Sequence, residues 1–452
     1  MKSFSRKLGL VEKFMTLGHE VGGGLIVNVV YLEGFLAPDT VKQALKLVQN
    51  RHPILQVYIV ECEDEFYFKS EGITEIPLQV LYKQDDNEAI KFAETELHKQ
   101  FENGKNPLCR LTILYPDYYH NSCEIVMTFH HGIVDGISCM QFIDELVCYC
   151  QQITDGENVS TVESLKLLPP AEDLLNYKII NEKAIESHQL TKEKQTIVPQ
   201  LIIEQEASAN ERFTRMLPRM LSQEKTKMLI KKCKQEETTV HSAICTAMLL
   251  ASAKLLSIDN QVNFSYGFPV NLRKYCEPEI TNENLGCFIS VLAFNQLIHQ
   301  NTFFWDLARE CKAKTHDALI SGVHINLLKQ GKLREKQSLN FERERMIQSR
   351  LSQENTMGRN NLFSISNRGK FKLCYKGDKL KIKELYFAIG QHLRGDCFWS
   401  GVVTFNDQLF CNFIYVEPLI SKKTAQLLAD NVIMLLEKVC INQNLTLAML
   451  HD

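Results

Sequence analysis

Short apolar runs alternate with amphipathic helical stretches through the first 165 residues, and this alternation constrains the fold more than any other feature of the sequence. The β-branched run at residues 25–34 precedes a helical stretch that begins at Pro-Asp-Thr and stops at Pro53. Strand patterns follow at 54–60 and 64–70, then a second helical stretch at 85–101, two strand patterns at 109–115 and 123–129, and a helix pattern from residue 136. The alternation predicts an α/β lobe in which helices cover an apolar sheet.

The pattern weakens between about residues 152 and 212 and then resumes. Two helical patterns occupy 221–256, strand patterns follow at 261–271 and 361–371, and residues 398–416 predict a hairpin with Asn406-Asp407 at its tip. At 452 residues the chain also exceeds the size of one ordinary core. We therefore predict a first lobe at 1–165, a linker at 166–212 and a second lobe at 213–452.

Charge and composition exclude several classes of function. A net charge of −3 lacks the basic excess of a nucleic-acid-binding protein. The fifteen cysteines contain no C-x-x-C pair, so neither a zinc site nor a disulfide framework is indicated, and they are predicted to be buried thiols. The longest apolar stretch, residues 243–256, is too short to cross a bilayer, and no signal sequence is recognisable. We expect a cytoplasmic protein.

The stretch "FHHGIVDGIS" at residues 129–138 carries the candidate chemistry. His131 follows an apolar strand and precedes a helix, at the strand end where α/β proteins place ligands, and a histidine of near-neutral pKa suits a general base. Two alternatives concern its neighbours: Asp135 could be only a helix N-cap, and His130 a core residue. A second H-x-x-x-D spacing, His392 to Asp396, lacks the neighbouring His and Gly, so we interpret it as a chance match.

The complete H-H-x-x-x-D-G pattern arises by chance in such a chain on the order of once in several hundred. It resembles the active-site motif of the acyltransferases that share the chloramphenicol-acetyltransferase-like fold, including condensation domains, polyketide-associated acyltransferases and alcohol acetyltransferases. Further segments resemble the family in its order along nearly the whole chain: 6–14, 50–56, 101–114, 266–290 and 364–371. The Asp-Phe-Gly-Trp-Gly signature of the plant branch is absent.

The resemblance implies two such lobes, each an α/β two-layer sandwich, forming a V with the active-site tunnel between them. It implies that His131 is the general base and that backbone N–H groups around Gly136 stabilise the oxyanion. His130 would support this loop, and Asp135 would pair with Arg273 as a structural brace.

Asn367 would lie at the lobe interface beside the substrate channel. The alternative for this residue is a turn that stabilises the strand end.

The leading hypothesis is an acyltransferase that moves an acyl group from acyl-CoA or a phosphopantetheinyl carrier protein to a hydroxyl, without a covalent enzyme intermediate, in secondary metabolism or lipid assembly. One alternative is a free-standing peptide condensation enzyme with an amine acceptor, and another is a catalytically degenerate scaffold that docks carriers. The resemblance implies no metal and no bound cofactor. The expected partners are the thioester, the acceptor and, for a carrier-bound donor, an acyl carrier protein. Because both lobes lie in one chain, we expect a monomer.

Overall fold

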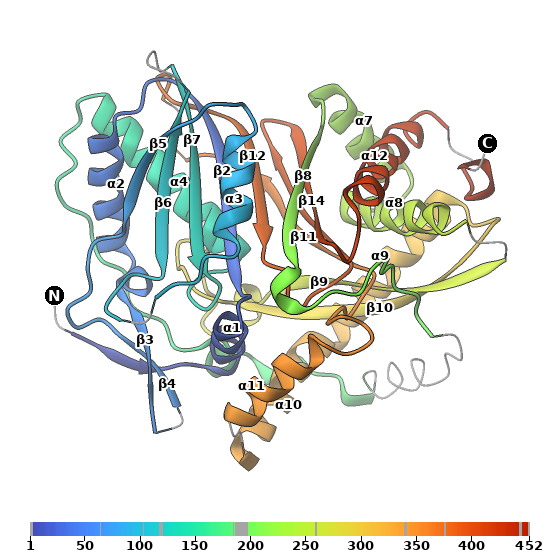
Figure 1. The fold of residues 1–452 in the computed structure, drawn as a ribbon, viewed down its shortest axis with the longest axis horizontal. Coiled ribbons are helices and arrows are strands. Elements are labelled where there is room, and N and C mark those ends of the chain that lie inside the picture. The colour runs from blue at the N-terminus through green and yellow to red at the C-terminus, as the bar shows by residue number, and fades with distance from the viewer. Residues whose placement is uncertain are drawn as a thin grey trace.

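Two mixed sheets organise the chain into two lobes that lie side by side (Figure 1). The structure is a computed structural model that describes residues 3–63, 65–102, 104–116, 121–183, 185, 198–257, 260–338, 341–374, 377–442 and 445–450. Helices cover the sheets of both lobes, so the predicted α/β fold class with two lobes is confirmed.

A five-stranded sheet in the order β12-β2-β7-β6-β5 forms the first lobe. Helices α2 and α4 pack together on one face of this sheet, and α3 contacts β2 and β7 from the other. The bounds are β2 Leu25–Glu33, α2 Pro38–Arg51, β5 Leu78–Tyr82, α3 Glu88–Glu96, β6 Cys109–Tyr115, β7 Ser122–His130, α4 Gly136–Thr154 and β12 Lys381–Ile389.

A small sheet in the order β1-β4-β3 lies beside helix α1 at the lower end of this lobe in Figure 1. Its elements are β1 Ser5–Lys7, α1 Leu10–Glu20, β3 Tyr58–Cys62 and β4 Glu65–Lys69. The strand that the sequence predicts from Ile54 instead begins at Tyr58, because Pro53–Gln56 forms a 3₁₀ helix, separated from α2 by the extended residue His52. A proline at the first helical position favours this short turn, since its φ is already helical.

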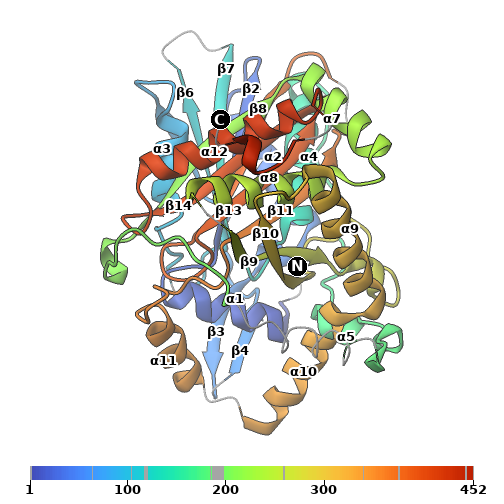
Figure 2. The same ribbon diagram turned by 90° about the vertical axis from the view of Figure 1, so that its right-hand side faces the viewer.

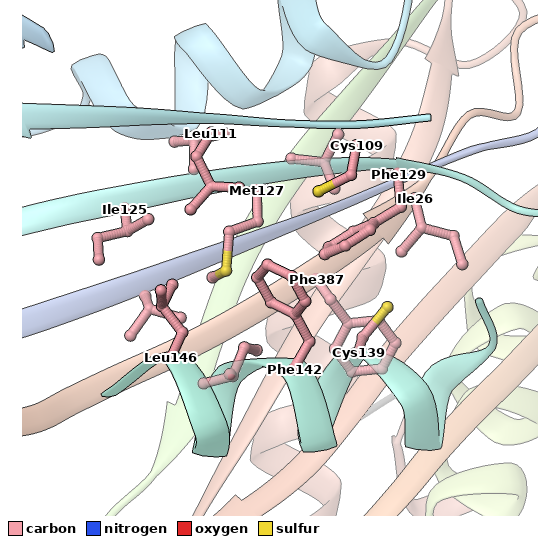
Figure 3. Close-up of a cluster of buried hydrophobic side chains, with 14 of the residues drawn as sticks. Ile26, Cys109, Leu111, Ile125, Met127, Phe129, Cys139, Phe142, Leu146 and Phe387 are labelled. Atoms are coloured by element: carbon pink, nitrogen blue, oxygen red, sulfur yellow. The ribbon is translucent and has the colours of Figure 1, made fainter. Parts of the chain in front are cut away.

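The core of the first lobe lies between α4 and the sheet, as Figure 3 shows. Phe142 and Leu146 of α4 point at Met127 and Phe129 of β7, and the rings of Phe129 and Phe142 meet edge to face at 4.9 Å. All four side chains are buried to about 1% exposure or less. This packing fixes the start of α4 against the end of β7, which is where the H-H-x-x-x-D-G motif lies.

The second lobe is built on a six-stranded sheet in the order β10-β9-β11-β13-β14-β8. Figure 2 shows α8 and α12 in front of it, and every residue of α8 from Ser242 to Ala253 is buried, which explains the apolar stretch in the sequence. The bounds are β8 Phe213–Leu221, α7 Gln223–Gln235, α8 Val240–Leu255, β9 Gln261–Asn271, β10 Ile289–His299, α9 Phe304–Ser321, β11 Phe363–Phe371, β13 Phe398–Phe405, β14 Gln408–Glu417 and α12 Lys422–Lys438. The predicted hairpin with Asn406-Asp407 at its tip is confirmed.

Strands β9 and β11 separate soon after they meet, which opens the sheet. They are parallel and pair only through Phe363 and Ser364 of β11. Leu362 N–H donates to the Ser265 carbonyl, so alternate residues from Ser265 onward, Gly267 and Pro269 among them, direct their backbone groups toward β11. Pro269 lacks an N–H group at a point where β11 has already diverged, so no ladder bond is lost.

Strand β12 crosses from the second half of the chain to the first lobe, where it pairs antiparallel with β2 along nearly its whole length. The predicted division at residue 213 assigns β12 to the second lobe, but β12 belongs to the sheet of the first lobe. The second lobe is therefore not one uninterrupted segment of the chain. The predicted linker contains three short elements: α5 Ala171–Leu174 and the 3₁₀ helices Tyr177–Ile179 and Ala209–Glu211. Part of this linker lies outside the described residues. The remaining elements are α10 Val323–Ser338, α11 Phe341–Leu351 and the 3₁₀ helices Arg273–Tyr275 and Ala448–Leu450.

Within the described ranges, no helix combines the length and apolar character needed to span a membrane. All fifteen cysteines are free thiols. Eleven of them are buried, as the sequence predicts, whereas Cys62 and Cys374 are exposed and Cys148 and Cys440 are half-buried.

Candidate active site

A cavity of about 390 Å³ lies between the two lobes, and the loop that carries the H-H-x-x-x-D-G motif forms part of its wall. The first lobe contributes His131, Asp135 and Gly136. Residues of β9 and β11, where these two strands separate, form a second wall, and residues of β12 form a third. A volume of this size falls in the range of small-molecule sites. The side chains and backbone that line it from these three strands are Gly267, Phe268, Pro269, Asn271, Ser364, Ser366, Asn367, Arg368, Phe387, Ala388 and Ile389.

His131 is held in one orientation by its own loop. Its Nδ1 lies 2.9 Å from the carbonyl oxygen of Val134, and its backbone N–H donates to the Gly24 carbonyl at 2.9 Å. Because a carbonyl only accepts, Nδ1 must carry the proton in the neutral ring, and Nε2 keeps a free lone pair. Among the residues that the structure describes, Nε2 has no hydrogen-bond partner. The ring therefore presents a base at the cavity wall.

Burial lowers the pKa of His131 below its ordinary value. The charge of Arg368 acts in the same direction, while the Asp135 carboxylate and the Val134 carbonyl oppose it. The imidazole is therefore neutral at pH 7, which is the protonation state that a general base requires.

His130 supports the loop from the opposite side. Its Nδ1 accepts a hydrogen bond from Gly132 N–H at 2.9 Å, and its ring lies 4.6 Å from the ring of His19. A Cβ atom on Gly132 would approach the His130 ring to 3.0 Å, so a larger residue would crowd this contact. Burial, and then the neighbouring His19, keep the pKa of His130 well below its ordinary value. His130 does not line the cavity, and its position is that of a framework residue.

Asp135 and Arg273 form a fully buried ion pair that joins the lobes. Arg273 Nη1 donates to Asp135 Oδ2 at 2.7 Å, and the two side chains are 2% and 1% exposed. The carboxylate also accepts from Ser138 N–H at 2.8 Å, which makes it the N-cap of α4, and from Phe288 N–H at 3.0 Å. The expectation of a brace and the alternative of an N-cap therefore describe the same carboxylate.

Burial would raise the pKa of Asp135, but the Arg273 charge and the hydrogen bonds from Arg273, Ser138 and Phe288 together hold it below its ordinary value. Asp135 is thus ionised at neutral pH, and both of its carboxylate oxygens accept hydrogen bonds. All of its partners lie on the framework, so it is not placed to relay a proton.

Gly136 has a specific steric role that the sequence did not reveal. A Cβ atom at this position would lie 3.2 Å from Nε and 3.4 Å from Cγ of Arg368, and Gly136 is not among the residues with positive φ. A larger residue at this position would therefore press on the side chain of Arg368, and the glycine does not serve an unusual turn. The expected oxyanion role of its backbone remains a proposal.

Asn367 is half-buried and lines the cavity from β11. Its Oδ1 accepts a hydrogen bond from Gly369 N–H at 2.9 Å. The residue is therefore both at the lobe interface, as the resemblance implies, and in the turn that the alternative describes.

Two further residues reach this cavity without having been singled out as site residues. Arg368 lies in its wall, one residue beyond Asn367. Asp396, which belongs to the second H-x-x-x-D spacing, also lines it, and Oδ1 of Asp396 accepts from Asn361 Nδ2 at 2.9 Å. The sequence predicts this spacing to be a chance match, and the structure nevertheless places its aspartate in the cavity wall. Arg368 lies on β11 of the second sheet, and Asp396 lies between β12 and β13, so the tertiary fold places them in the cavity wall and no local pattern could have indicated them.

Cys287 raises the question of a covalent mechanism, because its Sγ lies 3.9 Å from Nδ1 of His131. Burial keeps the pKa of this thiol well above its ordinary value, so it is not a thiolate at neutral pH. The sulfur faces the nitrogen that is bonded to Val134, and Cys287 is not part of the cavity wall.

For the acyl transfer that the sequence resemblance implies, Cys287→Ala is expected to keep kcat/KM within about threefold of wild type, since a buried neutral thiol supplies no nucleophile. The measurement is steady-state transfer with and without iodoacetamide, and Cys276→Ala is the matched control for removal of a buried thiol. A loss of about a hundredfold or more in Cys287→Ala, with no change in stability, would indicate a covalent intermediate.

Two lobes of mixed α/β structure with a cavity between them, and the H-H-x-x-x-D-G loop in the cavity wall, are the arrangement that the sequence resemblance implies. The sequence matches the family described as Condensation domain over residues 26–451. The chain belongs to the condensation-domain family.

Individual relatives are distant. A curated relative, the polyketide synthase PksN of Bacillus subtilis (strain 168), is 27% identical over 124 residues, which are 26% of this chain and only 2% of that protein. The trichothecene 15-O-acetyltransferase TRI3 of Fusarium sporotrichioides has a similar structure, with a TM-score of 0.71 at 11% identity over 96% of this chain and 95% of that one. The starter condensation domain of rhizomide synthetase RzmA, solved as a mutant in complex with C8-CoA, gives 0.68 at 13% identity over 98% and 96%. At these identities the structures show a shared fold.

Proposed function

We propose that this protein is an acyltransferase that moves an acyl group from a thioester donor to the hydroxyl of an acceptor. The observation that carries the proposal is the state of His131: Nδ1 is fixed on the Val134 carbonyl, and Nε2 has a free lone pair at the wall of the interlobe cavity. A neutral imidazole in this position can act as a general base.

The reaction follows from this base. Nε2 of His131 takes the proton of the acceptor hydroxyl as its oxygen attacks the thioester carbonyl carbon. The carbonyl electrons move to oxygen and form a tetrahedral oxyanion, and in this proposal backbone N–H groups at the start of α4 stabilise it. The C–S bond then breaks, and the imidazolium returns the proton to the departing thiolate. No enzyme nucleophile and no metal is needed for this sequence.

The donor is a substrate and not a resident cofactor. The complex of the RzmA domain with C8-CoA supports an acyl-CoA donor, and the match to PksN supports a phosphopantetheinyl carrier protein. The similarity to TRI3, a trichothecene 15-O-acetyltransferase, favours a hydroxyl acceptor, while the condensation-domain match itself favours an amine acceptor as the second candidate.

The remaining parts of the proposal concern assembly and location. All walls of the cavity come from one chain, which supports an active monomer, and the intact base argues against a docking scaffold. The proposal includes a cytoplasmic location, because fifteen free cysteines fit a reducing compartment.

The test is product formation by the full chain, followed by mass spectrometry, with acyl-CoA and acyl-carrier donors offered to primary alcohols and to amines of the same carbon skeleton. We expect ester formation that exceeds amide formation and that requires wild-type protein. Amide products alone would support the peptide condensation alternative, and no transfer from any donor would support the scaffold.

A further inference from the structure

Arg368 is a buried cation without an anionic partner, and it lies beside His131 in the cavity wall. Its Nη1 donates to the Asn28 side-chain oxygen at 2.6 Å and contacts the Met140 sulfur at 3.5 Å. Its Nε is buried and has no hydrogen-bond acceptor. Throughout the described residues, Arg368 forms no ion pair with a carboxylate.

Two other buried arginines differ from Arg368. Arg273 has the Asp135 carboxylate and three further oxygen acceptors, on Asn271, Ser138 and Asn284. Arg212 donates to four backbone carbonyl oxygens, which spread its charge over the local dipoles. A buried guanidinium usually requires such compensation, because desolvation of a charge is costly. Arg368 alone of these three lacks it.

The guanidinium of Arg368 is nevertheless held rigidly. Its central carbon lies 3.4 Å from the centre of the Phe387 ring, so the planar group is stacked on the aromatic face. Gly136 leaves the space that its aliphatic stem fills. Such a fixed, planar group with donors to spare matches the geometry of a carboxylate, which accepts two parallel N–H bonds from arginine.

We propose that Arg368 binds a carboxylate of the substrate, so that either the acyl group or the acceptor carries a negatively charged group close to the reacting carbonyl. The inference rests on the proposed function, because it names the substrate class of the same cavity. A bound carboxylate would supply the missing counter-charge of Arg368. It would also offset the effect of that cation on His131 and make the imidazole a stronger base once the substrate is in place.

Binding can be tested without any transfer. Succinate is titrated into the full chain, with the uncharged succinamide as its isosteric control, and the fluorescence of Trp399 in the cavity wall is followed together with the unfolding temperature. We expect saturable binding of succinate, at least about tenfold weaker binding of succinamide, and a loss of succinate binding of about tenfold or more in Arg368→Met. Arg368→Lys, which keeps the charge but not the fork, should bind with intermediate strength.

The matched control is Arg219→Gln. Arg219 lies on β8 outside the cavity and pairs with Asp430, so its loss should leave succinate binding unchanged. Equal binding of succinate and succinamide by the wild type, or unchanged succinate binding in a folded Arg368→Met, would overturn the proposal.

A transfer assay distinguishes the two sources of the carboxylate. Succinyl-CoA is compared with butyryl-CoA as donor, and a hydroxy acid is compared with its methyl ester as acceptor. For the substrate that bears the carboxylate, Arg368→Met should lose about tenfold or more of the kcat/KM with the charged compound and less than about threefold with the neutral one. The comparison that shows this difference tells whether the donor or the acceptor bears the carboxylate. An equal loss for charged and neutral substrates would overturn the proposal and assign Arg368 to the oxyanion instead. His131→Ala separates this inference from the proposed function. Transfer that survived in that variant would refute the general base, whereas succinate binding by Arg368 does not depend on His131 and should remain.

Discussion

Replacing His131 with alanine is expected to lower the kcat/KM for acyl transfer by about 10²- to 10⁴-fold. The physical reason is that Nε2 has the only free imidazole lone pair placed on the cavity wall by the described residues, so no neighbouring group can take its part. The measurement is steady-state transfer with the best thioester and acceptor pair, accompanied by the unfolding temperature of each variant. The fold should survive, because the side chain contributes one hydrogen bond to its own loop.

The pH dependence of the wild type provides an independent readout. The pKa of His131 is lowered by burial, and the neutral form is the active one. The kcat/KM should therefore rise with pH along a titration centred below about 6.5 and be level above about pH 7. His299→Ala, which removes an exposed histidine at the end of β10, should behave as wild type. If His131→Ala keeps transfer within about threefold of wild type, the general-base mechanism is wrong.

Asp135→Ala is expected to lower the free energy of unfolding by about 3–5 kcal/mol and to abolish most of the activity. The substitution leaves the Arg273 guanidinium buried beside a missing carboxylate, and it removes the N-cap of α4 and the acceptor of Phe288 N–H. Chemical denaturation monitored by circular dichroism measures the effect.

A double-mutant cycle separates the brace from general damage to the core. Arg273→Met alone should be destabilising because it orphans the Asp135 carboxylate, whereas Asp135→Ala/Arg273→Met should lose much less than the sum of the two single changes. Activity should remain low in the double variant, since the loop that holds His131 is no longer tied to the second lobe. Wild-type stability in Asp135→Ala would show that the ion pair does not brace the site.

The sequence predicted those parts of the fold in which local pattern and burial agree. The strand at 25–33 and the helix that begins at Pro38 are examples, because apolar periodicity and the proline boundaries give the same answer. Residues 53–56 are different: their apolar side chains suit a strand as well as a 3₁₀ turn, and only the packing against α2 decides.

The candidate site was predictable where it is contiguous in sequence, as it is for His130, His131 and Asp135. The pairing of Asp135 with Arg273, 138 residues away, came from the resemblance and could not have been derived from either segment alone. Arg368 was missed because nothing in a short strand-end segment indicates which cations will be buried without a partner. That property depends on Phe387, on Gly136 and on the separation of β9 and β11.

The return of β12 to the first sheet also bears on whether the two halves of the chain can exist apart. Strand β2 has β7 on one side and β12 on the other, and nearly all of its residues are buried. A protein truncated near residue 165 would expose the backbone groups of β2 as a long apolar edge, which is a template for aggregation. It would also lack both Arg368 and the Phe387 ring on which its guanidinium lies. We infer that the two halves fold as one cooperative unit and that the first half alone would aggregate.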